Sequence, residues 1–355
     1  MRWLCVALVF LAACSSITSP TASNSPATST TSTSSRVTYP GSSPSPGRYA
    51  VMQRGIGTLD LIDETRGQLA VATQVDQPRS ARRGVIPWTS MSSSRVFYLN
   101  SSSEVWFLAP DGSTGQITTI PVAADEQAGF AVSPDEQRIA VAIFKYPDAT
   151  TYGGMRMYVE DLRGGGHHFD IFSSATAAEF PIGWVGANLV VAVSVPSCCP
   201  NLALNPYIAS EYHVVDPQTG RRLETICAGA PPRGPVVAAG AMCLPPEGGA
   251  PSFVRWDGSA FSSPGAIPDA GQFLEALSPD GTHVLVGGSP IRVFGAGSDF
   301  RFDMNGWAIG WIDATHVIVR NAQDDGYFLM DPRSGQGVEL SAETGFLGTL
   351  PVAIS

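Results

Sequence analysis

The sequence predicts an all-β fold built from repeated units, and three observations carry this prediction. Two hairpins are nearly identical, AVSPDEQRIAVA at residues 131–142 and ALSPDGTHVLVG at residues 276–287. A turn in which Asp ends an apolar strand and Gly follows shortly recurs along the chain. An apolar segment, GFLGTLPVAI (345–354), is left over once the repeats are counted. Together they indicate a seven-bladed β-propeller over residues 48–355.

The two hairpins share one design. In each, a short apolar stretch leads into a Ser-Pro-Asp turn, and an alternating apolar strand follows. A second matching pair, PIGWVGANLVVAV (181–193) and AIGWIDATHVIVR (308–320), supports the repeat. Alternation is the pattern of a strand with one buried face, and no stretch after Arg48 has a helical period.

The Asp-to-Gly turn sets the length of the repeat. Asp caps local amides and Gly accepts a positive φ, so both suit a tight turn between strands. The copies are about 36 to 55 residues apart, which fits a four-stranded blade. The seven copies are LIDETRG (61–67), LAPDGSTG (108–115), VEDLRGG (159–165), VVDPQTG (214–220), RWDG (255–258), the degenerate VFGAGS (293–298) and LMDPRSG (329–335).

Strand counting predicts how the ring closes. The first unit, residues 48–75, has room for three strands, and residues 345–354 supply a spare one. We expect this C-terminal strand to pair into the N-terminal blade, because closure removes the free sheet edge. A six-bladed ring is the alternative, since residues 232–300 repeat weakly; two separate β-sandwiches would leave the regular spacing unexplained.

The hairpins also carry a family resemblance. SPDEQRIAVA and SPDGTHVLVG resemble the blade repeat of TolB-like, WD40-like propellers, in which Ser-Pro-Asp-Gly opens a hairpin. Two of the seven predicted blades show the motif well, and there is no room for the additional N-terminal domain of TolB itself. The resemblance implies a protein-binding propeller outside the cytoplasm and transfers no site residues.

The N-terminus predicts an export signal and a lipid anchor. MRWLCVALVFLAACSSITSP has one positive charge and then an apolar run too short to span a bilayer permanently. Leu11-Ala12-Ala13-Cys14 resembles the lipobox of bacterial lipoproteins, which implies that residues 1–13 are removed and that Cys14 carries acyl chains such as palmitate. The chain would then be extracytoplasmic and lipid-anchored to the bacterial cell membrane. An ordinary secretory signal cleaved near Ala13 is the alternative.

A tether and a low charge follow from composition. About three quarters of residues 15–47 are Ser, Thr or Pro, so residues 14–47 are expected to form a disordered tether after the lipidated cysteine. The chain of 355 residues has a formal net charge of −10, and Lys145 is its one lysine. Scattered arginines on an acidic chain lack the clustered positive field that nucleic acid requires, so no nucleic-acid partner is expected.

Four cysteines remain after Cys5 and Cys14 are assigned to the signal and the lipid. They are Cys198, Cys199, Cys227 and Cys243, and an even count in an exported chain favours disulfides. Blade geometry places all four on one face of the fourth and fifth blades. We expect two bridges that join Cys198 and Cys199 to Cys227 and Cys243, with a four-thiolate metal site as the rival.

The longest loops indicate a binding face. KYPDATTYGG (145–154) and VPSCCPNLALNPYIAS (195–210) are expected to project from the same face of adjacent blades, and elaborated loops on a rigid scaffold commonly bind ligands. Plain solvent-exposed decoration is the competing interpretation. The candidate contact residues are Tyr146, Asp148, Tyr152, Asn201, Asn205 and Tyr207.

Motifs for catalysis and cofactors are missing from the sequence. It contains no Gly-x-Ser-x-Gly, no His-Glu-x-x-His, no phosphate-binding loop and no Cys-x-x-Cys, so no catalytic residue or cofactor is predicted. His167 and His168 follow a Gly-Gly-Gly turn and are expected at the surface. Asn321 and Asp325 give only a weak calcium candidate, because an acidic first ligand is missing. The recurrence of Trp184 and Trp311 at matching positions predicts packing between blades.

These observations favour a non-catalytic function. The first hypothesis is a membrane-anchored module or scaffold that binds a protein or a cell-envelope component. One alternative is a propeller hydrolase of the lactonase type, whose catalytic residues converge on the central channel without a linear motif. Another is a small-molecule-sensing lipoprotein with its site in the same channel. An enzyme should present several carboxylates or histidines clustered with a metal at the channel mouth, whereas a binding module should present a neutral, aromatic-lined face around Tyr152 and Tyr207.

Overall fold

The computed structural model describes residues 47–78, 87–148, 151–194, 209–245, 249–265, 267, 275–295, 298–340 and 343–351. Within these ranges the chain forms strands and turns and no helix. The described part accordingly holds no helix with the length and apolarity needed to cross a membrane. The predicted signal (1–13), Cys14, the body of the tether, Cys198, Cys199, Asn201, Asn205 and Tyr207 lie outside the described residues.

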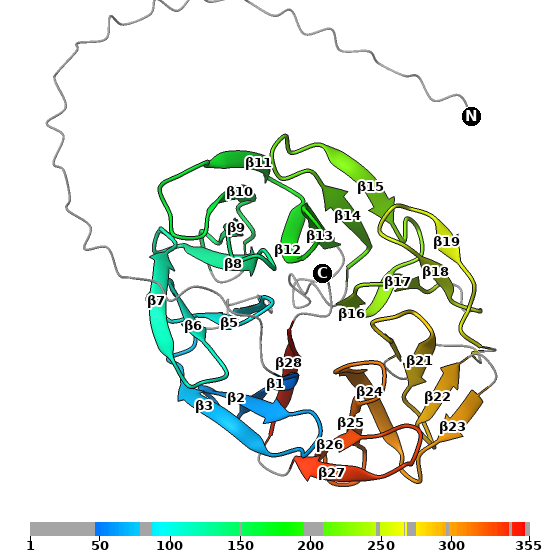
Figure 1. The fold of residues 1–355 in the computed structure, drawn as a ribbon. Coiled ribbons are helices and arrows are strands. Elements are labelled where there is room, and N and C mark those ends of the chain that lie inside the picture. The colour runs from blue at the N-terminus through cyan, green and yellow to red at the C-terminus, as the bar shows by residue number, and fades with distance from the viewer. Residues whose placement is uncertain are drawn as a thin grey trace, which may run out of the picture. The chain divides into compact units, whose positions relative to one another are not determined.

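The described strands form seven four-stranded antiparallel sheets arranged in a ring, which confirms the seven-bladed propeller (Figure 1). In each sheet we name the strands a to d from the centre outward. The first three blades are β28 (Gly345–Leu350), β1 (Tyr49–Arg54), β2 (Thr58–Asp63), β3 (Leu69–Gln74); β4 (Thr89–Met91), β5 (Val96–Leu99), β6 (Glu104–Leu108), β7 (Thr114–Thr119); and β8 (Glu126–Val132), β9 (Arg138–Lys145), β10 (Met155–Asp161), β11 (Phe169–Ser174).

The remaining four blades follow the same order. They are β12 (Ala178–Val185), β13 (Asn188–Ser194), β14 (Glu211–Val215), β15 (Arg222–Ile226); β16 (Pro232–Val237), β17 (Gly240–Cys243), β18 (Ser252–Val254), β19 (Ala260–Phe261); β20 (Glu275–Leu277), β21 (His283–Val286), β22 (Arg292–Gly295), β23 (Ser298–Arg301); and β24 (Gly306–Trp311), β25 (Val317–Asn321), β26 (Tyr327–Met330), β27 (Gly337–Leu340). The weakly repeating region 232–300 thus forms two blades, and the six-bladed alternative is wrong.

The ring closes as the sequence predicts. β28, the last strand of the chain, pairs antiparallel with β1, the first, so that Tyr49 lies opposite Leu350 and Gln53 opposite Gly345. Thr344, just before β28, adds a backbone hydrogen bond to the Gln53 carbonyl at 2.7 Å. The first blade therefore contains both ends of the described chain, and the pairing of β28 with β1 inside that blade closes the ring.

The seven Asp-to-Gly turns all join strands c and d of their blades. In the fourth blade, for example, the Asp216 carboxylate accepts the amide N–H of Gln218 at 2.9 Å and the Thr219 hydroxyl at 2.7 Å. Gly220, with φ of 67°, lets the chain turn into β15. Because the strands alternate in direction, the a–b and c–d turns lie on one face of the ring, and the b–c and d–a connections lie on the other. We call these the c–d face and the b–c face.

The twin hairpins owe their likeness to the Ser-Pro-Asp turn between strands a and b. The buried Ser133 hydroxyl oxygen accepts the Arg138 amide N–H at 2.9 Å, and in the sixth blade the buried Ser278 accepts the His283 N–H at the same distance. Each serine thus pins the start of strand b to the end of strand a. This turn fixes the register of two blades that lie on different sides of the ring.

Hydrophobic residues fill the spaces between neighbouring blades. One large cluster spans the third to fifth blades, with Phe144, Phe180 and Trp184 among its fully buried side chains. The Phe144 and Phe180 rings stack across the boundary between the third and fourth blades, with centroids 4.5 Å apart. This packing makes the ring a rigid support for whatever its centre and faces bind.

One buried ion pair between blades was not predicted from the sequence. Glu136, with φ of 57°, lies in the a–b turn of the third blade and binds Arg95 of the second blade at 2.9 Å. The Ser92 and Ser94 hydroxyls donate to the same carboxylate. In the sixth blade Gly281 takes the equivalent position with φ of 73°. Glu136 tolerates the left-handed backbone because these partners hold its side chain.

Candidate functional site

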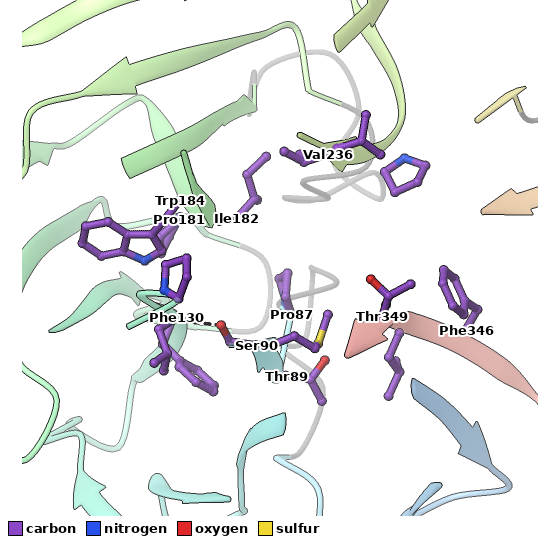
Figure 2. A pocket seen from close by; sticks show the side chains of 18 of the residues that line it. Pro87, Thr89, Ser90, Phe130, Pro181, Ile182, Trp184, Val236, Phe346 and Thr349 are labelled. Atoms are coloured by element: carbon purple, nitrogen blue, oxygen red, sulfur yellow. Dashed lines mark hydrogen bonds between the residues drawn. The ribbon is translucent and has the colours of Figure 1, made fainter. Parts of the chain in front are cut away.

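The inner strands surround a cavity at the centre of the ring, with a volume of about 140 Å³ (Figure 2). Strands β4, β8, β12, β16, β24 and β28, from six different blades, contribute to its wall. That wall is neutral and largely apolar throughout its described part. It consists of Pro87, Thr89, Ser90, Met91, Phe130, Val132, Pro134, Pro181, Ile182, Gly183, Trp184, Tyr212, Gly234, Pro235, Val236, Val237, Trp311, Phe346, Leu347, Gly348 and Thr349.

Local backbone features shape this cavity. Gly348 in β28 has φ of 150°, and a Cβ there would overlap the Met91 side chain of the neighbouring β4. Glycine therefore lets the first and second blades approach closely at the centre. On the opposite side of β4, the Ser90 hydroxyl oxygen accepts the Val132 amide N–H at 2.9 Å and fixes β4 against β8. The inner ends of these strands are thus held in place before any ligand arrives.

The predicted binding face corresponds to the b–c face of the third and fourth blades. Tyr146, Asp148 and Tyr152 lie in the β9–β10 connection, where Asp148 is exposed and both tyrosines are half-buried. The Tyr152 hydroxyl donates to the Ala177 carbonyl at 2.7 Å, and the two tyrosine rings meet edge to face at 6.2 Å. Burial raises the pKa of both phenols. The side chains of Tyr146 and Tyr152 pack against the hydrophobic core of the propeller. Asp148 is therefore the exposed residue among the three predicted contacts that the structure describes.

An open groove of about 380 Å³ lies beside that connection on the third blade. Its walls include Glu126, Lys145, Gly154 and Arg156. Arg156 binds both carboxylate oxygens of Glu126, at 2.6 and 3.3 Å. Burial acts to raise the pKa of Glu126, but the hydrogen bond and charge of Arg156 outweigh it, so this pKa lies below its ordinary value. The groove is polar and carries both signs of charge.

The disulfide on this face differs from the expected pairing. Cys227 and Cys243 are bonded to each other, with Cα atoms 5.2 Å apart, and not to Cys198 and Cys199 as predicted. Cys227 follows strand d of the fourth blade and Cys243 ends strand b of the fifth, as the blade geometry predicts. The chain between them runs down β16 and back up β17, which returns it to the same face. The bridge ties two blades together at their edge.

Below this face, a buried histidine lies between two carboxylates. His213 of β14 is 2 % exposed; its Nε2 is 2.8 Å from Glu211 and its Nδ1 is 3.4 Å from Glu179. His213 and Glu179 line a small cavity of about 90 Å³ between the third and fourth blades, together with Arg222. Glu211 lies two residues before His213 in the same strand, whereas Glu179 comes from β12 and becomes a neighbour of the histidine only in the folded sheet.

The adjacent histidines occupy the c–d turn of the third blade, as expected. His167 has a side chain that is 88 % exposed and an Nδ1 3.0 Å from Asp161. His168 contacts Glu160 and Asp170 at 3.1 and 3.3 Å, and the hydrogen bond to Glu160 raises its pKa. The two rings therefore bind different carboxylates and do not converge on one point.

The calcium candidates lie in the β25–β26 hairpin, where their side chains serve the turn itself. The Asn321 side-chain oxygen accepts the Gln323 amide N–H at 3.0 Å, and Asp325 pairs with Arg320 at 3.1 Å. A different group of described residues, Glu64, Asp313 and His316, has the spacing that a metal ion would need. Their potential ligand atoms all lie within 4.8 Å of one another.

That acidic group sits on the c–d face of the seam between the first and seventh blades. The His316 Nδ1 is 3.1 Å from Asp313. Burial, together with the charge and hydrogen bond of Asp313, raises the pKa of Glu64 to about 7. A proton on Glu64 thus relieves the crowding of the two carboxylates. A matching pair, Glu343 and Asp60, occupies the b–c face of the same seam.

Comparisons with known proteins support the fold. No family model matches the chain, and no curated protein matches it. Among solved structures, Pyrococcus horikoshii acylaminoacyl peptidase is 13 % identical, with a TM-score of 0.51 over 86 % of this chain and 52 % of that one. The chain thus spans about half the length of the peptidase. BamB from Moraxella catarrhalis is 13 % identical, with a TM-score of 0.38 over 80 % and 81 % of the two chains. Apo AztD from Citrobacter koseri is 10 % identical, with a TM-score of 0.42 over 85 % and 96 %. At this level of identity the likeness concerns the β-propeller architecture.

Proposed function

We propose that this chain is a lipid-anchored, extracytoplasmic propeller that binds a protein or cell-envelope partner without catalysing a reaction. One observation carries the proposal: the described wall of the central cavity is neutral, and its polar side-chain groups are hydroxyls and the indole N–H groups of Trp184 and Trp311. Acid–base and nucleophilic catalysis need an activated group beside the substrate, such as a histidine or carboxylate. The described wall offers a surface for contact and no such pair of groups.

Two further features support the proposal. The Cys227–Cys243 disulfide suits an oxidising compartment, which agrees with an exported chain whose Cys14 carries lipid. The rigid ring presents a polar groove and an exposed loop on the b–c face of the third blade. A partner that docks there would meet the exposed side chain of Lys145, at the end of β9.

The test is site-specific photo-crosslinking in the full-length protein in intact cells. A photo-reactive amino acid replaces Lys145, and the matched control replaces Arg333, which is exposed in a c–d turn on the opposite face. The proposal predicts a discrete protein or polymer adduct from position 145 and none from position 333. Folded, membrane-bound protein that yields no adduct at 145, or the same adducts at both positions, would contradict the docking face.

Lipid anchoring has its own readout. Cys14→Ser should move the protein from the membrane fraction to the aqueous fraction and abolish incorporation of labelled palmitate. A Cys14→Ser protein that stays in the membrane fraction, or still incorporates palmitate, would contradict the anchor and leave the binding role to be judged by the crosslinks.

A further inference from the structure

The central cavity has the construction of a small-molecule site. Its body is apolar: Phe130 of β8, Ile182 of β12, Val236 of β16 and Leu347 of β28 face it from four blades, and Met91 of β4 completes the wall. Figure 2 shows Phe130, Ile182 and Val236 among the side chains that line the cavity. Because each strand belongs to a packed blade, the wall is preformed, and a ligand would not have to order it.

The hydroxyl of Thr349 is available within this apolar wall. Thr349 is 6 % exposed and lines the cavity, yet its hydroxyl makes no hydrogen bond within the described part of the chain. The hydroxyl of Ser90, which also lines the cavity, already has a partner, because its oxygen accepts the Val132 amide N–H at 2.9 Å. A hydroxyl that borders the cavity can donate or accept a hydrogen bond, and a ligand atom placed there would supply the partner.

Charge and size narrow the ligand class. An ion would lose its hydration in this cavity and would find no opposite charge on the described wall, so the ligand must be neutral. The volume of about 140 Å³ is close to that of engineered apolar cavities of roughly 150 Å³ that hold benzene. A body the size of one aromatic ring therefore fits.

We propose that the central cavity binds a neutral small molecule with a single-ring apolar body and one hydrogen-bonding atom directed at Thr349. The body packs against Phe130, Ile182 and Val236, and the polar atom satisfies the threonine hydroxyl. This inference rests on the proposed function, because it assigns a ligand chemistry to the centre of the binding module.

Phenol and benzene are the probes, titrated separately into the full-length protein and followed by calorimetry and by the fluorescence of Trp311, which lines the cavity. Phenol should bind more tightly than benzene. Thr349→Val keeps the shape and removes the hydroxyl, so it should weaken phenol binding about fivefold to tenfold and leave benzene binding unchanged. Ile182→Trp fills the cavity and should abolish binding of both probes.

Val236→Phe is a second filling variant in case Ile182→Trp does not fold, and Val338→Trp on the exposed outer strand β27 is the matched control that should bind both probes normally. Folded protein that binds neither probe, or filling variants that bind as well as the unaltered chain, would overturn the inference. Equal losses of phenol and benzene in Thr349→Val would remove the role of its hydroxyl. A crosslink at position 145 without probe binding would contradict only the proposed ligand site in the central cavity. Probe binding without a crosslink would contradict only the proposed docking face.

Discussion

The indole nitrogen of Trp311 donates a hydrogen bond to the carbonyl oxygen of Ala276, 2.8 Å away in the inner strand of the preceding blade. Trp184 makes the same bond to Ala131 at 3.2 Å between the third and fourth blades. Each acceptor lies two residues before the Ser of a Ser-Pro-Asp turn. Each Ser-Pro-Asp hairpin therefore forms one contact between blades with the Trp-containing strand of the following blade. This contact joins the third blade to the fourth and the sixth blade to the seventh.

The residue that follows each turn completes this contact. The Arg138 guanidinium lies 5.2 Å from the centre of the Trp184 ring, and the His283 ring lies 6.0 Å from Trp311. Sequence comparison of the hairpins predicted packing of the tryptophans between blades, and the structure confirms it. The carbonyl acceptors could not be foreseen, because they become neighbours only when the ring closes.

Replacing Trp311 should weaken the ring measurably. Trp311→Phe leaves the Ala276 carbonyl without its donor, so we expect the free energy of unfolding in urea to fall by about 1–3 kcal/mol. Trp307→Phe, in the same strand at a half-buried position, should cost about 0.5 kcal/mol or less. Equal effects of the two variants would show that the hydrogen bond contributes nothing.

Replacing Glu136 with glycine should destabilise the protein, although glycine suits the backbone conformation of this turn. Glu136→Gly relieves the left-handed φ, worth about 1 kcal/mol, but removes the carboxylate that forms the buried ion pair with Arg95, which costs about 3–5 kcal/mol. We therefore expect a net loss of stability, and the double variant Arg95→Met/Glu136→Gly should recover most of it. A single Glu136→Gly variant that is more stable than the unaltered protein would contradict this account of the ion pair.

The seam between the first and seventh blades should weaken as the pH rises. Burial and the neighbouring Asp60 raise the pKa of Glu343 to about 8, although the charge of Arg54 acts to lower it. Burial and the neighbouring Asp313 raise the pKa of Glu64 to about 7, although the charges of Arg48 and His316 act to lower it. Both folded-state pKa values exceed the unfolded value near 4.5, so the folded chain binds more protons. The stabilisation is complete below about pH 4.5 and is lost as the pH rises through 7 to 8.

Urea unfolding between pH 5 and 9 measures this slope. Glu343→Gln, which keeps the hydrogen-bonding shape without the charge, should flatten it, and the exposed control Glu339→Gln should leave it unchanged. An identical slope in the Glu343→Gln protein would rule out the carboxyl pair as its origin.

The c–d turns should set the acid limit of stability. Turn hydrogen bonds hold the pKa of Asp216 below 3.8, chiefly the amide of Gln218, and that of Asp257 likewise, chiefly the hydroxyl of Ser259. Groups with a lowered folded pKa stabilise the fold above the unfolded value, and this contribution is lost as the pH falls through the folded value. Asp216→Asn should therefore reduce the loss of stability between pH 4 and 2, as followed by thermal unfolding, and an unchanged acid limb would contradict the role of this turn.

The Cys227–Cys243 bridge should contribute to stability through the loop it closes. The two residues are 16 positions apart, and a loop of this length corresponds to about 3 kcal/mol in the chain-entropy model. The double variant Cys227→Ser/Cys243→Ser should lose about that much in oxidising buffer. If the double variant unfolds at the same urea concentration as the unaltered protein, the bridge is not stabilising.

The blades could be predicted from the sequence because each is a local object. Asp63 and Gly67, or Asp331 and Gly335, mark their turns within five residues, and the strand register follows from alternation. The face on which Cys227 and Cys243 lie also followed from strand order. Their pairing did not, because it depends on how closely the end of the fourth blade approaches the fifth, a lateral distance that alternation does not encode.

The cavity could not be predicted for the same reason. Ile182, Val236 and Thr349 are ordinary strand residues in sequence, and they meet only because six inner strands converge. The unusual position of Glu136 could have been recognised in the sequence. It stands where the matching hairpin has Gly281, at a position that requires a positive φ. A charged residue there indicates a side chain held by partners, and comparison with Gly281 could have found it.

The binding site is tested most directly by a crystal structure of the protein grown with 4-bromophenol and measured at the bromine absorption edge. We expect a bromine peak in the central cavity, near Ile182 and Val236, with the phenolic oxygen within hydrogen-bonding distance of the Thr349 hydroxyl. A cavity without the ligand, while bromine peaks appear elsewhere on the molecule, would contradict the claim that the centre of this propeller is a binding site.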